Sequence, residues 1–177
     1  FDNTIWITYN TSNSGLPHNL VRDLAIDGDE NKWIASGGGL VKYDGSEWFV
    51  YDTSNSGIPE NYATGIVIDK EENKWIKIGD GFGPFLGVVK FDGNDWTVYN
   101  TSNSGLPNNW IGAITAQGNG SVWIGTGGGG LAKFDGINWT IYNTANSGLQ
   151  HNDVTAIVFD ENGKMYVGTG GGLAIYN

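Results

Sequence analysis

The chain has 177 residues and a formal charge of −10, from 19 acidic and 9 basic residues, and it contains no cysteine. The acidic excess argues against DNA, RNA and acidic membrane surfaces as partners, because polyanions are bound by clustered lysine and arginine. The absence of cysteine excludes disulfides, thiolate metal sites and a cysteine nucleophile.

The first 52 residues contain one complete structural unit of four strands, preceded by a further short strand. Residues 1–10 read FDNTIWITYN, a short strand, and the polar phrase TSNSGLPHN follows at 11–19. Three more strands are predicted from LVRDLAID, NKWIAS and LVKYD, and DGSEWFVYD supplies a fourth after an Asp-Gly hairpin turn. Each segment is rich in β-branched and aromatic residues and is bounded by Gly, Asn or Asp, which indicates antiparallel strands.

The same unit recurs along the rest of the chain. The polar phrase begins again at Thr53, Thr101 and Thr144, and the same strand segments follow in the same order. A period of roughly 43 residues with four strands per unit is typical of a propeller blade. We therefore expect a single domain over 1–177 with blade 1 at 11–52, blade 2 at 53–100, blade 3 at 101–143 and blade 4 at 144–177.

The fourth unit stops before its last strand, and the matching segment stands at the other end of the chain. Residues 1–10 align with FDGNDWTVYN at 91–100. The prediction is an all-β propeller of four four-stranded antiparallel blades, closed by the N-terminal strand, which completes blade 4 and removes an exposed sheet edge. A fragment of a longer propeller and two chains forming an eight-bladed ring stay open as alternatives.

The segments NSGLPNNWIGAI and WIGTGGGGL carry a resemblance to a known family. They resemble the two-component-regulator propeller repeat of periplasmic sensor regions in bacterial hybrid histidine kinases and of related secreted propellers. The resemblance covers essentially the whole chain and implies a periplasmic or extracellular binding domain. Those sensor regions usually carry seven blades per propeller, whereas this sequence has four units.

Positions that recur in every unit are most simply architectural. One aromatic register lies on the second strands (Trp33, Trp75, Trp123 and Tyr166). A second register lies on the outer strands (Trp48 with Tyr51, Trp96 with Tyr99, Trp139 with Tyr142, and Trp6 with Tyr9). We expect these rings to form the core between blades rather than sugar platforms. The run GTGGGG at 125–130 matches a dinucleotide-binding pattern, but a strand follows it where that pattern needs a helix, so we interpret it as structural.

Positions that differ between units are where a specific function is expected. Blade 2 alone expands the loop between its second and third strands, to GDGFGPFLG at 79–87. The residue that ends each phrase also varies, and both loops lie on one face of a propeller, where ligands often bind. The predicted ligand-binding residues are Tyr62, Trp110, Asp153, Asp80, Phe82 and Phe85. The alternative is that these rings pack against a neighbouring blade or plug the channel.

No catalytic residue, cofactor or metal site is predicted. No Ser-His-Asp order stands out, and most acids lie in hairpin turns, so a propeller lyase or hydrolase is the less favoured alternative. One more variable position holds His18, Glu60 and His151, which would suit a transition metal only if the side chains converged.

The sequence favours a non-catalytic extracytoplasmic binding or sensing propeller with a carbohydrate or peptide ligand. The competing hypothesis is a structural or self-assembly module, such as a rigid spacer, a filament unit or half of a larger propeller, with protein partners only. A homo-oligomer fits this second hypothesis, and neither a nucleic acid nor membrane insertion is expected for either.

Overall fold

The computed structural model describes residues 5–79 and 85–176, and within these ranges the chain is built of strands without a helix. Blades 1 and 2 comprise β1 (Val21–Ile26), β2 (Lys32–Ser36), β3 (Gly39–Tyr43), β4 (Trp48–Tyr51), β5 (Ala63–Ile68), β6 (Lys74–Ile78), β7 (Val88–Phe91) and β8 (Trp96–Tyr99). Blades 3 and 4 comprise β9 (Ile111–Ala116), β10 (Val122–Thr126), β11 (Gly130–Phe134), β12 (Trp139–Tyr142), β13 (Val154–Phe159), β14 (Met165–Thr169) and β15 (Gly172–Tyr176).

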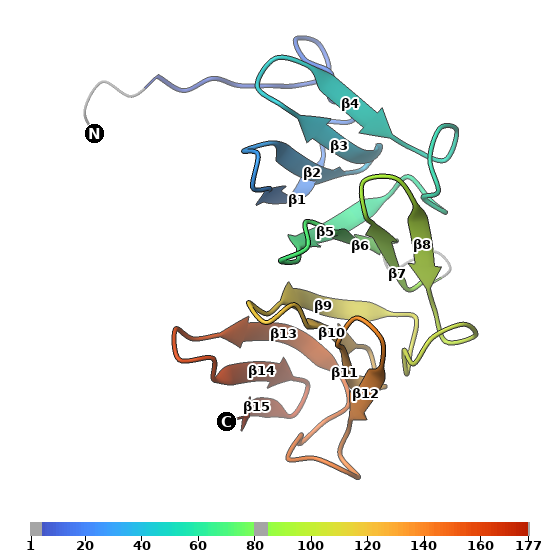
Figure 1. Ribbon diagram of the computed structural model, residues 1–177, viewed down its shortest axis with the longest axis vertical. Coiled ribbons are helices and arrows are strands. Elements are labelled where there is room, and N and C mark those ends of the chain that lie inside the picture. The colour runs from blue at the N-terminus through green and yellow to red at the C-terminus, as the bar shows by residue number, and fades with distance from the viewer. Residues whose placement is uncertain (1–4, 80–84, 177) are drawn as a thin grey trace.

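The strands form four separate antiparallel sheets in chain order, which confirms the all-β architecture. Three sheets have four strands each, β1-β2-β3-β4, β5-β6-β7-β8 and β9-β10-β11-β12, and β13-β14-β15 form the last. The first strands of neighbouring blades contact one another, β1 with β5, β5 with β9, and β9 with β13. Figure 1 shows the blades following one another in an open arc, with blade 1 at one end and blade 4 at the other.

The predicted closure by the N-terminal segment is not confirmed in this structure. Residues 5–10 form no strand, and the side chain of Trp6 is 87% exposed. The Tyr9 ring instead packs against Tyr43 and Trp48 of blade 1, with centroid distances of 5.6 and 5.3 Å. Figure 1 shows the segment extending from blade 1, at the opposite end of the arc from β15. The edge of β15 is therefore unpaired within the described residues.

The recurring aromatic residues form the core between blades. Trp33 of β2 is buried, stacks on Tyr51 of β4 at 5.8 Å, and meets Phe91 of blade 2 edge-on at 6.0 Å. Blade 2 repeats the arrangement toward blade 3, where Trp75 stacks on Tyr99. Such aromatic pairs add to the burial of their large apolar area. The rings thus bind each blade to the next.

Each buried indole also needs a hydrogen-bond acceptor, which a polar residue six positions earlier supplies. Trp33 Nε1 donates to Asp27 Oδ2 at 2.8 Å, and Trp75 Nε1 donates to Asp69 Oδ2 at the same distance. Burial by itself raises the pKa of Asp27, but hydrogen bonds from Trp33 and Asn31 and the charge of Lys74 outweigh it and leave the pKa lowered. The stabilisation from ionised Asp27 is therefore present above about pH 4 and is lost as the pH falls through its lowered pKa.

The repeated polar phrase is the joint between blades. The second, third and fourth copies carry the chain from the outer strand of one blade to the first strand of the next. The aliphatic residue of the phrase is buried in every copy (Leu16, Ile58, Leu106 and Leu149). In blade 3 the Asn109 side chain accepts a hydrogen bond from the Thr101 amide at 2.7 Å, which ties the two ends of the phrase together. The phrase is thus held by its own hydrogen bonds and needs no ligand.

The glycine of this joint leaves room for an outer-strand tryptophan. A side chain at Gly105 would overlap Trp139 Cβ, whereas Gly118, in the turn after β9, has nothing within 4 Å of the position a Cβ would take. We predict that Gly105→Ala lowers the free energy of unfolding by about 1–3 kcal/mol, because the indole must move out of its packing. Gly118→Ala should change it by less than about 1 kcal/mol. Urea unfolding of both variants checks this, and equal losses would contradict it.

Candidate functional site

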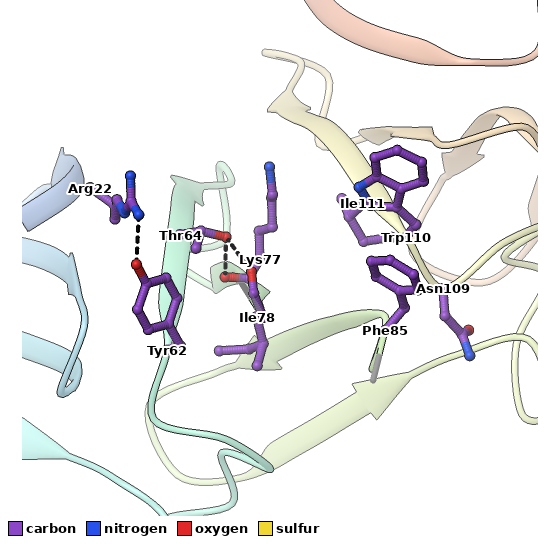
Figure 2. Close-up of a pocket in the computed structure, with 10 residues that line it drawn as sticks. Arg22, Tyr62, Thr64, Lys77, Ile78, Phe85, Asn109, Trp110 and Ile111 are labelled. Atoms are coloured by element: carbon purple, nitrogen blue, oxygen red, sulfur yellow. Dashed lines mark hydrogen bonds between the residues drawn. The ribbon is translucent and has the colours of Figure 1, made fainter. Parts of the chain in front are cut away.

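A cavity of about 360 Å³ opens on the face formed by the joints and the loops between second and third strands. Blades 1, 2 and 3 all contribute to its wall, as Figure 2 shows. The lining residues are Arg22, Tyr62, Thr64, Lys77, Ile78, Gly79, Phe85, Asn109, Trp110 and Ile111.

Backbone hydrogen bonds place the variable ends of the phrases on this face. The Gly79 amide donates to the carbonyl of Tyr62 at 2.8 Å, and the Gly127 amide donates to the carbonyl of Trp110 at 2.9 Å. Each bond joins the start of a first strand to the loop that follows the second strand of the same blade. The backbone therefore fixes where Tyr62 and Trp110 stand, whatever their side chains are.

One wall of the cavity is aromatic. The rings of Phe85 and Trp110 stack with centroids 5.4 Å apart and an angle of 20° between their planes. The Trp110 ring lies against Gly127, where a Cβ would overlap it, so the glycine allows the ring to lie flat on the loop. Phe85 and Trp110 stay about half exposed, in contrast to the buried tryptophans of the core. The pair offers a flat apolar surface to a ligand.

The facing wall is cationic. Arg22 Nη2 donates a hydrogen bond to the Tyr62 hydroxyl at 2.6 Å, and its guanidinium carbon lies 5.5 Å from the centre of the Tyr62 ring. The Lys77 side chain lies between the Arg22–Tyr62 pair and the aromatic wall (Figure 2). Arg22 is the chain's single arginine. Two cations in one cavity are notable in a protein of charge −10.

The positive charge of the Lys77 amine is only partly balanced by neighbouring groups. Burial lowers the pKa of Lys77, and the nearby carboxylate of Asp23 raises it only in part. Asp23 is committed elsewhere, because its side chain accepts hydrogen bonds from the amides of Leu24 and Ile66, both at 2.9 Å. Lys77 Nζ donates to the carbonyl of Gly112 at 3.3 Å. The remaining donor capacity of the ammonium group suits an anionic ligand.

A second hollow of about 350 Å³ adjoins the first. It is lined by Phe85, Thr101, Pro107, Asn108 and Asn109, and it shares Phe85 and Asn109 with the larger cavity. Phe85 therefore stands between two adjacent spaces. A ligand longer than a single ring could occupy both.

The structure brings together only some of the residues singled out from the sequence. Tyr62, Trp110 and Phe85 line the cavity. Asp153 directly precedes β13 of blade 4, at the end of the arc, and does not line the cavity. Asp80 and Phe82 lie outside the described residues.

Sequence reasoning missed the residues that give the cavity its charge. Arg22 aligns with Thr64, Gly112 and Thr155 in the other units, and Lys77 aligns with Ala35, Gly125 and Gly168. Arg22 and Lys77 therefore each differ from the residues at the same position in the other units, as Tyr62 and Trp110 do. A comparison of the four copies along the strands, and not only in the loops, would have found them.

The metal hypothesis gains no support from the positions of its residues. His18 Nδ1 accepts the Leu20 amide and His151 Nδ1 accepts the Asp153 amide, each at 3.0 Å within its own phrase. The two histidines belong to blades at opposite ends of the arc, with Glu60 in the joint before blade 2. Over residues 5–79 and 85–176, no three His, Cys, Asp or Glu side chains form a group that could hold a metal ion.

A family model matches two segments of the chain. Residues 105–128 and 148–171 match the family model described as Two component regulator propeller. These two segments are therefore similar to repeats of this type, in line with the resemblance seen in the sequence. No curated protein matches the chain. The part of the chain that the structure describes has no helix of the length and hydrophobicity that a membrane crossing requires.

Solved structures similar to this chain are propellers of longer proteins. The extracellular domain of BT3049, described as a hybrid two-component system from B. thetaiotaomicron, matches with 27% identity and a TM-score of 0.79, over 97% of this chain and 23% of that one. PorZ, a bacterial surface component of the type-IX secretion system of Porphyromonas gingivalis, matches with 20% identity and a TM-score of 0.71, over 97% and 28%. Virginiamycin B lyase from Staphylococcus aureus matches with 11% identity and a TM-score of 0.64, over 89% and 55%. The chain thus spans about a quarter of the first two proteins, and the likenesses to PorZ and to the lyase show the fold alone.

The partial burial of the Lys77 amine leads to a prediction about stability. We expect Lys77→Met to raise the free energy of unfolding near neutral pH by up to about 1 kcal/mol, a bound set by solvent screening of this half-buried group. Folding opposes protonation of Lys77, so the wild-type chain should gain stability as the pH rises from the lowered folded pKa to the unfolded value near 10.4. The advantage of Lys77→Met should shrink over that range. Thermal unfolding from pH 7 to pH 10 measures it, and a constant difference would contradict it.

Proposed function

We propose that the protein is an extracytoplasmic binding or sensing domain whose cavity takes a carbohydrate that carries an acidic group. The observation behind this proposal is the pairing of the Phe85–Trp110 wall with the Arg22–Lys77 wall across one cavity. A site of this kind combines an apolar platform with a few placed polar groups, which is the usual composition of small-molecule sites.

The two walls suit different parts of the same ligand. The apolar face of a sugar ring can stack on Trp110 or Phe85, while a carboxylate on the ring can accept hydrogen bonds from Arg22 and Lys77. The cavity volume of about 360 Å³ fits a small ligand, and the adjoining hollow beyond Phe85 gives room for a further sugar unit. An oligosaccharide containing uronic acid matches this combination.

A location outside the cytoplasm is supported by the similar structures. The matches to BT3049 and BT4673 of B. thetaiotaomicron are both to extracellular domains of signalling-system proteins. Similar repeats and a similar fold support a sensing role for this chain. In such a role the domain binds a ligand and does not catalyse a reaction.

The titratable groups that line the cavity also support binding over catalysis. Among the residues that the structure describes, those that line it are Arg22, Lys77 and Tyr62, and the carboxylate of Asp23 lies close enough to Lys77 to raise its pKa. Glycoside hydrolysis as usually performed requires two carboxyl groups flanking the bond that is cleaved. Cations that hold a carboxylate in place require no such pair.

Titration calorimetry with defined sugars tests the proposal. We expect oligogalacturonides to bind and neutral malto-oligosaccharides of the same length to bind at least tenfold more weakly, a difference of about 1.4 kcal/mol. Trp110→Ala and Arg22→Gln should each weaken binding about tenfold or more. Phe49→Ala, which removes an exposed aromatic ring outside the cavity, is the matched control and should leave the affinity unchanged.

Binding should also depend on pH through Lys77. Because burial lowers the pKa of Lys77, its charge and the affinity for the acidic sugar should fall as the pH rises through that lowered pKa, below the ordinary lysine value. Lys77→Met should bind more weakly at neutral pH and lose this dependence. Equal affinity for acidic and neutral sugars, or binding of a peptide library but of no sugar, would overturn the assignment.

A further inference from the structure

A further cavity, of about 310 Å³, lies between blades 2 and 3 on the face opposite the joints. Its wall is formed by the turn after β5, the turn after β9 and the hairpin after β11, which leave the strands at the ends remote from the joints. The buried side chains of Asp69 and Trp75 line it, and the carboxylate of Asp135 stands at its exposed edge. It shares no lining residue with the cavity proposed for the sugar.

At the same place between blades 1 and 2, the chain supplies an ammonium group of its own. Lys74 Nζ lies 3.9 Å from Asp27 Oδ2 and 4.8 Å from the centre of the Trp33 ring, and the side chains of Lys74 and Asp27 are both buried. Asp27 and Trp33 are the blade 1 counterparts of Asp69 and Trp75. A carboxylate and the face of an indole ring both attract positive charge. Lys74 therefore balances the buried carboxylate at this interface.

The interface between blades 3 and 4 carries neither of these two charges. Gln117 occupies the position of Asp27 and accepts a hydrogen bond from Trp123 Nε1 at 3.1 Å. Met165 occupies the position of Lys74 and is 1% exposed. A neutral acceptor is thus accompanied by an apolar side chain, whereas a carboxylate is accompanied by a lysine. The acid and the base change together because a buried charge without its partner is costly.

Of the three interfaces that the structure describes, the one between blades 2 and 3 keeps the carboxylate without the lysine. Asp69 is 6% exposed and accepts a hydrogen bond from Trp75 Nε1 at 2.8 Å. Val122 stands at the position of Lys74 and packs in one apolar cluster with Trp75. Valine carries no charge and is shorter than lysine. The cavity is lined by Asp69 and Trp75, the counterparts of the two groups that the lysine contacts at the first interface.

Neighbouring lysines do not replace the missing one. Lys90 Nζ lies 5.9 Å from the centre of the Trp75 ring. Its blade 1 counterpart, Lys42, lies at 6.0 Å from the Trp33 ring, and Lys74 is present there as well. Over residues 5–79 and 85–176 the chain forms two ion pairs, and Asp69 takes part in neither (Lys70 with Glu71, and Lys74 with Asp27). Asp69 therefore lacks a cation that the equivalent carboxylate of blade 1 has.

We propose that this cavity binds a linear aliphatic diamine, with one ammonium group beside Asp69 in the place that a lysine of the chain takes at the first interface. The alkyl chain lies against Trp75, and the second ammonium group meets a carboxylate at the edge of the cavity. Glu71 is already paired with Lys70 at 3.4 Å, which leaves Asp135 for this contact. The formal charge of −10 favours the approach of a dication.

Exchanging the residues of the two interfaces tests the site. Titration calorimetry with cadaverine, a five-carbon diamine, should give one diamine per wild-type chain. Val122→Lys copies the first interface and should weaken binding at least tenfold, because the new ammonium group takes the place beside Asp69. Lys74→Val copies the second interface and should raise the number of bound diamines to two. Ile5→Lys and Lys164→Val change the net charge by the same amounts outside the cavity, and both should still bind one.

Analogues of cadaverine show whether both charges are recognised. A pentanediol of the same length carries no charge and should give no saturable heat. Pentylamine, which keeps one ammonium group, should bind at the same stoichiometry as cadaverine but more weakly. Asp135→Asn should lower the affinity for cadaverine toward that for pentylamine, because the second ammonium group loses its carboxylate. Binding of the diol as tight as that of cadaverine would overturn the proposal, as would an equal response to sodium chloride at the same concentration of charge.

Circular dichroism and thermal unfolding of each variant separate binding from folding. Cadaverine should raise the melting temperature of the wild-type chain and leave that of Val122→Lys unchanged. Val122→Lys and Lys74→Val each decide the question without the other, so the loss of one variant through misfolding leaves the test intact. An affinity unchanged in the first, or a stoichiometry unchanged in the second, would contradict the proposal. Trp110→Ala alters the sugar cavity alone and should bind cadaverine as the wild type does, so the failure of either proposal is recognised separately.

Discussion

The stacking of aromatic rings between blades is the interaction on which the whole structure depends. A single blade has one sheet and cannot bury Trp33 or Trp75 by itself. Each ring is covered by a tyrosine of its own outer strand and by an aromatic residue of the next blade, as Trp33 is by Tyr51 and Phe91. Stability in such an array is close to the sum of its units and their contacts with neighbours. The joints follow from this requirement, because they bring the next blade close enough to cover the indole.

The same uniformity explains how a site can arise from a few departures. The joints and glycine loops hold equivalent positions of every blade on one face. A residue that is substituted in one blade therefore lies next to a residue that is substituted in the neighbouring blade. Arg22 comes from blade 1, Tyr62 and Lys77 from blade 2, and Trp110 from blade 3, and all four line one cavity. The rigid backbone fixes their mutual positions. It also supports an amine whose pKa is lowered by burial, since packing elsewhere offsets the cost.

An interaction that is satisfied only by a neighbour is left open at both ends of an array. In the described residues, Leu24 of β1 is exposed where blade 2 buries Ile66, and Leu173 of β15 is exposed where blade 3 buries Leu131.

The sequence by itself determined the strands, the four units, the all-β class and the aromatic core, because period, turn residues and ring positions are local or repeated signals. It also nominated Tyr62, Trp110 and Phe85. Only the tertiary structure decided that these meet Arg22 and Lys77, that Asp153 lies apart, and that residues 5–10 do not pair with β15 of the same chain. The physical reason is that identical repeats specify how one blade contacts the next, whereas the distance between particular side chains, their burial and the curvature of the array depend on the packing of all the blades together.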